Sequence, residues 1–98
     1  MRPADQPVIT LDAECAARVR AARLARFIPA RETVNGRAVV LEGLVPRMSG
    51  DLGSVFLTYD GSWWRVETRL ETFEKRRRRD RAQDVFLRMA VPAVEEES

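Results

Sequence analysis

The first apolar pattern along the chain predicts a helix over residues 10–27. Leu11, Cys15 and Val19 recur at every fourth position, so they lie on one face of a helix. Acidic residues near the start and arginines near the end of this stretch suit the helix dipole. Pro29 ends the pattern because its ring cannot continue a helix. We therefore expect an amphipathic N-terminal helix that covers a face or an end of the structure that follows.

Residues 34–45 change from a helical to an extended pattern. The Val-Asn-Gly sequence at 34–36 predicts a turn, since Asn and Gly adopt the positive φ that turns require. The stretch 37–45 is rich in β-branched and large apolar side chains and stops at Pro46, which predicts a strand. The glycine-containing residues 47–53 are then expected to form a loop.

The strongest local signal in the sequence is a hairpin centred on Asp60 and Gly61. The pair separates two β-rich runs, and Asp-Gly in this setting favours a two-residue type I′ turn. In that register Tyr59 lies opposite Ser62. Strand alternation predicts a core face with Val55, Leu57, Tyr59, Trp64, Val66, Thr68 and Leu70. The opposite, mixed face carries Phe56, Thr58, Trp63, Arg65, Glu67 and Arg69.

The last third of the chain, residues 72–91, allows either a hairpin or a helix. Residues 85–91 alternate weakly and have β character, which favours a final strand. Apolar residues at 82, 85, 86 and 89 also have helical spacing. We favour the strand because residues 76–81 have no apolar stripe that would hold a helix against a core.

These elements predict an α+β fold. An N-terminal amphipathic helix precedes a small antiparallel sheet, or partly open barrel, of about four to five strands with a central Asp-Gly hairpin. The 98 residues fit one hydrophobic core. We therefore divide the chain into a polar N-terminal arm (1–9), a single α+β domain (10–92) and an acidic disordered tail (93–98).

The composition argues against an enzyme or a metalloprotein. The chain has no His, which is the usual general base near neutral pH and the commonest metal ligand. Its single cysteine, Cys15, allows neither an intramolecular disulfide nor a zinc site built from Cys and His. We therefore expect a non-enzymatic protein with no catalytic residue, no bound metal and no cofactor.

The hydropathy pattern also predicts where the protein works. No apolar run approaches the ~20 residues that span a membrane, and the first residues lack the apolar centre of a signal peptide. We therefore expect a cytoplasmic protein without a membrane partner.

Basic residues are concentrated in one short segment, although the net charge is only +2. The segment contains Lys75, Arg76, Arg77, Arg78, Arg79 and Arg81. In the strand interpretation it is a loop or hairpin tip that projects from the sheet. Lys and Arg side chains placed there would neutralise phosphates and release counterions, which gives binding that is sensitive to salt and indifferent to sequence.

Trp63 is the second candidate feature, because it lies on the mixed face beside Phe56 and Arg65. An exposed aromatic ring next to Arg stacks on the bases of single-stranded nucleic acid. The same residue types also anchor protein interfaces. Packing of Trp63 beneath the helix is the structural alternative.

Two functions follow from these features. The first is a small non-catalytic module that binds the phosphate backbone of nucleic acid through the arginine-rich loop and an aromatic sheet face. The alternative is a protein-binding accessory protein of the kind found in phages or mobile elements, either a virion connector component or an inhibitor of a host complex. In that case the Trp63 face contacts another protein or a second copy of the chain.

Overall fold

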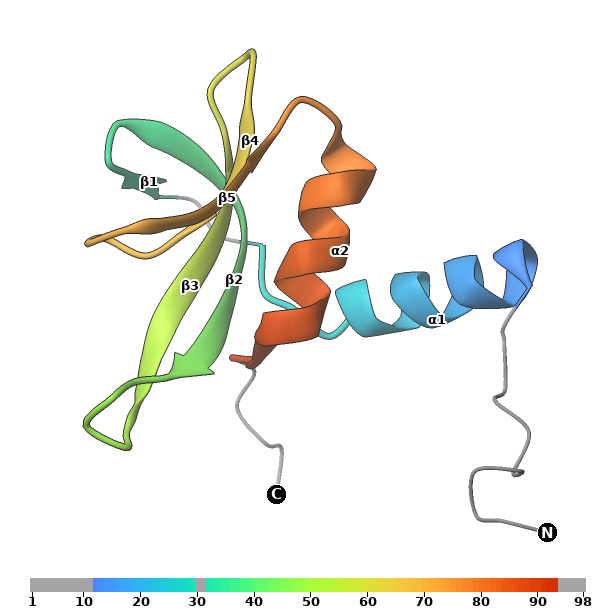
Figure 1. Ribbon diagram of the computed structural model, residues 1–98, viewed down its shortest axis with the longest axis horizontal. Coiled ribbons are helices and arrows are strands. Elements are labelled where there is room, and N and C mark those ends of the chain that lie inside the picture. The colour runs from blue at the N-terminus through green and yellow to red at the C-terminus, as the bar shows by residue number, and fades with distance from the viewer. Residues whose placement is uncertain (1–11, 30–31, 94–98) are drawn as a thin grey trace, which may run out of the picture.

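Figure 1 shows a computed structural model of the chain, which describes residues 12–29 and 32–93. The fold is α+β, as the sequence predicts. The elements are α1 (Ala13–Leu24), β1 (Thr33–Val34), β2 (Arg37–Pro46), β3 (Leu52–Tyr59), β4 (Trp64–Glu67), β5 (Thr72–Arg76), α2 (Arg79–Met89) and β6 (Val91–Pro92). The expected N-terminal arm (1–9) and residues 94–98 of the expected acidic tail lie outside the described residues.

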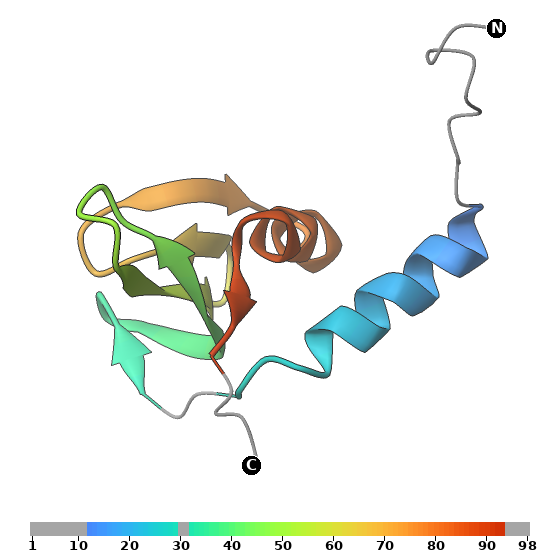
Figure 2. The same ribbon diagram turned by 90° about the horizontal axis from the view of Figure 1, so that it is seen from below.

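The sheet is antiparallel, with the strand order β1-β2-β3-β4-β5. The short strand β6 pairs with β2 near Gly43, beyond the end of β1, which brings the sheet to six strands. The register of β2 against β3 shifts between Val39 and Leu41, at a bulge. Bulges bend a strand and increase its twist, and Figure 2 shows the strands curving around one another rather than lying flat.

Two turns test the local signals of the sequence. Asn35 and Gly36 have φ of 54° and 79° and join Val34 to its partner Arg37, so the expected turn is present. At the β3–β4 hairpin, Tyr59 lies opposite Trp64 and not opposite Ser62, so the expected two-residue turn and its register are wrong.

The β3–β4 connection has four residues, 60–63, and the Asp60 side chain stabilises it. Its carboxylate accepts hydrogen bonds from the backbone N–H groups of Ser62 and Trp63, both at 2.8 Å. Because the register moves by two residues, each side chain keeps the face that strand alternation assigns to it.

The helix α1 differs most from its expected role. It begins after Asp12, whose carboxylate caps the helix by accepting a hydrogen bond of 2.7 Å from the Cys15 N–H. It ends at Leu24, three residues before the predicted end at residue 27. It contains no buried residue, so it does not cover the sheet. Figures 1 and 2 show it projecting away from the sheet, with its C-terminal end beside α2.

The second helix, α2, fills the place that α1 was expected to take. Ala82, Phe86 and Leu87 are buried against the core face of the sheet, so the expected final strand over 85–91 is wrong. The Phe86 ring lies 4.8 Å from that of Phe27 in an edge arrangement. The buried residues of this main core are Phe27, Leu41, Val45, Val55, Leu57, Val66, Ala82, Phe86, Leu87 and Ala90.

The mixed face of the sheet is buried over much of its length. Val34 and Val39 pack on Phe56 in a second, smaller core, and Phe56 is fully buried. Thr58 and Glu67 are also fully buried on this face. Both faces of β3 are therefore covered, one by α2 and the other by the β1–β2 hairpin as the sheet curves.

Candidate functional site

The basic segment (Lys75–Arg81) is not a loop but passes from a strand into a helix. Lys75 and Arg76 belong to β5, the next two arginines form the connection, and Arg79 and Arg81 lie in the first turn of α2. Every basic side chain in the segment is exposed. The short connection therefore keeps the segment at one end of the sheet, with Arg79 and Arg81 on opposite sides of α2.

Trp63 lies beside this segment, as the proposed site requires. Its ring is half-buried, with the Lys75 ammonium 4.6 Å and the Arg77 guanidinium 4.3 Å from the ring centre. Cations at this distance are attracted to the electron-rich ring face. A guanidinium held in this way keeps N–H groups free to bind an anion.

Trp64 is a site residue that the sequence interpretation missed. Its ring stacks on Tyr59 at 4.3 Å, and the Arg79 guanidinium lies 5.1 Å from its centre. Consecutive strand residues point to opposite faces of a sheet, so the two tryptophans hold cations on both sides of the hairpin. The Trp-Trp pair next to a basic run was the available signal, but strand alternation assigned Trp64 to the core only.

Two of the six cations have carboxylate partners. Arg76 pairs with Glu74, and Arg78 pairs with Asp80 at 2.9 Å. Among residues 12–29 and 32–93, no carboxylate forms an ion pair with the other four, which are Lys75, Arg77, Arg79 and Arg81. The surface therefore has an excess of positive charge that is suited to an anion.

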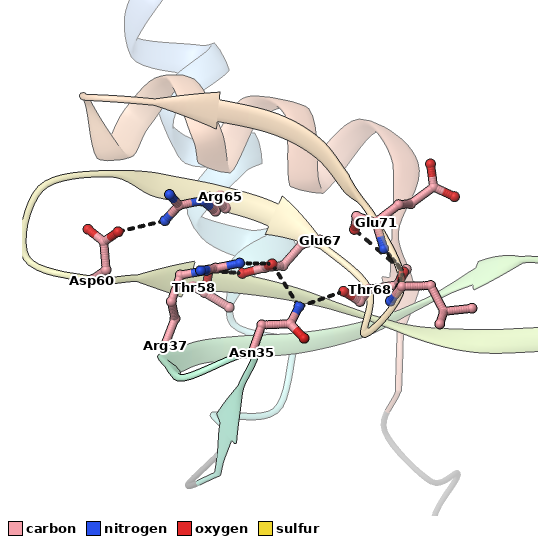
Figure 3. Close-up of polar contacts among 9 residues, drawn as sticks. Asn35, Arg37, Thr58, Asp60, Arg65, Glu67, Thr68 and Glu71 are labelled. Atoms are coloured by element: carbon pink, nitrogen blue, oxygen red, sulfur yellow. Dashed lines mark hydrogen bonds and ion pairs between the residues drawn. The ribbon is translucent and has the colours of Figure 1, made fainter.

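Arg65 is close to the segment but is occupied by Asp60. Its guanidinium donates a 2.7 Å hydrogen bond to the Asp60 carboxylate, and only 13% of its side chain is exposed (Figure 3). This hydrogen bond, with those from the loop backbone, holds the pKa of Asp60 well below its usual range. Arg65 therefore helps to fix the loop that carries Trp63.

Phe56 does not belong to the site. The side chain is fully buried in the second core, and the Arg69 guanidinium lies 5.1 Å from its ring centre. The expectation that Phe56 lies exposed beside Trp63 on a binding face is therefore wrong. The β1–β2 hairpin covers Phe56 through Val34 and Val39, whereas Trp63 lies beyond this small core.

Glu67 is the centre of a buried polar network on the same face (Figure 3). Its carboxylate accepts hydrogen bonds from Arg37 at 2.7 and 2.9 Å, from Thr58 at 2.6 Å and from Asn35 at 3.0 Å. Burial raises the pKa of Glu67, but these donors and the Arg37 charge outweigh that effect and lower the pKa to about 2. A carboxylate held ionised by four hydrogen bonds is a structural group rather than a general acid.

A separate apolar surface lies at the opposite end of the sheet. A hollow of about 530 Å³ opens between the β2–β3 loop and the β4–β5 turn. Met48, Leu70 and Phe73 line it, and Met48 and Leu70 are almost fully exposed. Exposed apolar side chains gathered around a hollow are typical of surfaces that contact other proteins.

Metal-binding clusters, membrane-spanning helices and known relatives give no further indication of function. No group of three or more metal-binding side chains comes together in the part of the chain that the structure describes. No helix within these residues is long and apolar enough to cross a membrane. No known protein family, curated protein or solved structure matches the chain.

Proposed function

We propose that the protein is a non-catalytic module that binds the phosphate backbone of nucleic acid. One observation supports this proposal above the others. Lys75, Arg77, Arg79 and Arg81 have no carboxylate partner among the described residues, and Trp63 and Trp64 hold three of these cations in place. Fixing long side chains before binding reduces the entropy that association loses.

The tryptophans have a different role in this proposal from the one that the sequence suggests. Lys75 and Arg77 lie over the Trp63 ring, so they compete with bases for its face. We assign Trp63 to positioning cations for phosphates rather than to stacking on bases. Binding is then expected to depend strongly on salt and weakly on base sequence.

Fluorescence anisotropy with labelled single- and double-stranded oligonucleotides, at low and high salt, tests the proposal. The variant Arg77→Ser/Arg79→Ser removes two charges from the site. We expect its salt dependence (log K against log salt) to be shallower by about 1.4 to 1.8, since each lost phosphate contact lowers the slope by about 0.7 on single strands and 0.9 on duplex.

The matched control is Arg18→Ser/Arg47→Ser, which removes the same charge from two exposed arginines outside the basic segment. Equal weakening by the two variants would show that only net charge matters and would contradict the assigned site. An absence of wild-type binding at low salt would contradict the function itself.

Protein binding is a second candidate function, favoured by the apolar hollow around Met48, Leu70 and Phe73. This surface lies at the far end of the sheet from Trp63, so it differs from the interface that the sequence suggests. Sedimentation velocity over a range of concentrations tests the version in which a second copy occupies the hollow. A protein that stays monomeric at every concentration would contradict that version.

A further inference from the structure

A second basic surface lies where α1 meets α2. Arg20 of α1 forms an ion pair of 3.4 Å with Asp84 of α2. At 3.6 residues per turn, Arg81 and Arg88 lie within about 60° of Asp84 around the helix axis. Arg23 follows Arg20 by three residues, so it lies on the same side of α1.

This α1–α2 corner (Arg20, Arg23, Arg81 and Arg88) has four cations and the carboxylate of Asp84, and the neighbouring Asp80 is paired with Arg78 of the basic segment. The Arg88 guanidinium donates a 3.2 Å hydrogen bond to the Asp84 carbonyl, which leaves its charge without a carboxylate partner in the described residues. Arg23, Arg81 and Arg88 are exposed. The corner is therefore a positive surface that no folding contact explains.

The basic groups on α2 lie on two sides of the helix. Arg79 is directed toward Trp64 and the sheet, whereas Arg81 and Arg88 lie on the side of Asp84 and α1. An α-helix with side chains is about 10–12 Å wide, so side chains on its opposite sides lie about that far apart. The major groove of a DNA duplex is about 12 Å wide, with a row of phosphates on each side.

We infer that the preferred ligand is a nucleic-acid duplex, with the N-terminal half of α2 facing its groove. This inference rests on the proposed function and adds the class of nucleic acid. The cations at Trp63 and Trp64 contact the phosphates of one strand, and the α1–α2 corner contacts those of the other. A single strand is flexible and loses conformational entropy if it spans both surfaces, whereas a duplex presents both phosphate rows at once.

The α1 helix fits this role because most of its side chains take no part in the core. No residue of α1 is buried, and Figure 1 shows the helix leaving α2 at a steep angle. Arg18 lies on the other side of α1 from Arg20 and pairs with Glu14 at 3.1 Å. The side of α1 toward the corner therefore carries Arg20 and Arg23, whereas Arg18 on the far side is suited to a control substitution.

The test compares a 20-base-pair DNA duplex with a 20-nucleotide thymidine strand, each labelled for anisotropy. The variant is Arg23→Ser/Arg88→Ser, which leaves the Arg20–Asp84 pair intact, and Arg18→Ser/Arg47→Ser is again the control. We expect the variant to bind the duplex about tenfold more weakly, with a salt slope shallower by about 1.8. We expect its affinity for the single strand to change less than about twofold, since single strands contact only one surface in this arrangement. Circular dichroism confirms that each variant is folded.

Equal losses on duplex and single strand, or no loss on the duplex, would overturn the inference and leave the proposed function standing. The same holds if the wild-type protein binds the thymidine strand as tightly as the duplex. Failure of the wild-type protein to bind either probe at low salt would overturn both.

Discussion

Replacing the buried Glu67 by Gln tests how the mixed face is held together. The substitution keeps the shape of the side chain but removes its charge. It also replaces one accepting oxygen with an NH₂ group, which cannot accept hydrogen bonds from Arg37 or Thr58. The variant therefore leaves a partly buried Arg37 guanidinium without its carboxylate.

The expected magnitude follows from the pKa of Glu67. The carboxyl has an ordinary value of 4.5 and a folded-state pKa of about 2. Because the folded state lowers the pKa, its stabilising effect is complete above pH 4.5 and is lost as the pH falls toward 2. This lowering of the pKa corresponds to about 3 kcal/mol at neutral pH and about 1 kcal/mol at pH 3.

Urea denaturation of both proteins between pH 7 and pH 3 measures this effect. We expect Glu67→Gln to lower the free energy of unfolding by about 3 kcal/mol at pH 7. The difference between the two proteins should shrink by about 2 kcal/mol at pH 3, because the Glu67 carboxyl is then protonated in the unfolded chain but still ionised in the folded protein. Taking this difference cancels the titration of other groups. A gap that does not change with pH would refute the reasoning, since it would show that the carboxylate charge contributes no stability.

Two further predictions concern the main core. Phe86→Ala should lower the free energy of unfolding, measured by urea denaturation, by about 3–5 kcal/mol. The control Phe73→Ala, at a side chain that is 38% exposed, should lower it far less. Similar losses for the two variants would contradict the assigned core. Gly43→Ala should cost about 1–3 kcal/mol, because its Cβ would lie 2.9 Å from both Ala90 Cβ and Phe27 Cε1. Adding Ala90→Gly should make the two changes non-additive, and strict additivity in thermal unfolding would argue against this contact.

The sequence predicts the fold class and the local turn chemistry because these depend on neighbouring residues. The Asn35-Gly36 turn follows from the tolerance of Asn and Gly for positive φ. The sequence does not predict the β3–β4 register, since the Asp60 side chain stabilises a longer loop than the Asp-Gly pair alone favours. Side-chain hydrogen bonds of this kind compete with standard turns.

The two helices show where a local pattern is insufficient. In α2 the buried residues begin at Ala82, about one turn after the helix starts at Arg79, so the arginines of the first turn need no apolar partner. In α1 the spacing of four residues between apolar side chains is present, but neither Cys15 nor Val19 is buried. Burial depends on where the sheet lies, which local spacing does not specify.

Local patterns indicate the parts of the candidate site that are close in sequence, but not the contacts between distant elements. The basic segment and Trp63 are neighbours because β4 pairs with β5; the run of charges identified the first, and strand alternation identified the second. Phe56 was assigned wrongly because the β1–β2 hairpin, distant in sequence, covers it. Trp64 and the α1–α2 corner depend on contacts between distant elements, such as the Arg20–Asp84 pair, that no local pattern reveals.

The absence of buried residues in α1 also affects how readily this helix unfolds locally. A helix of 12 residues is marginal on its own in water. Among the described residues, its C-terminal half contacts the rest of the fold through Arg20 and the partly buried Leu24. Its first turns are therefore expected to open independently of the sheet, so that their amide protons exchange with solvent far faster than those of β3. A ligand that binds along α1 must first order these turns, which lowers its affinity and speeds its release.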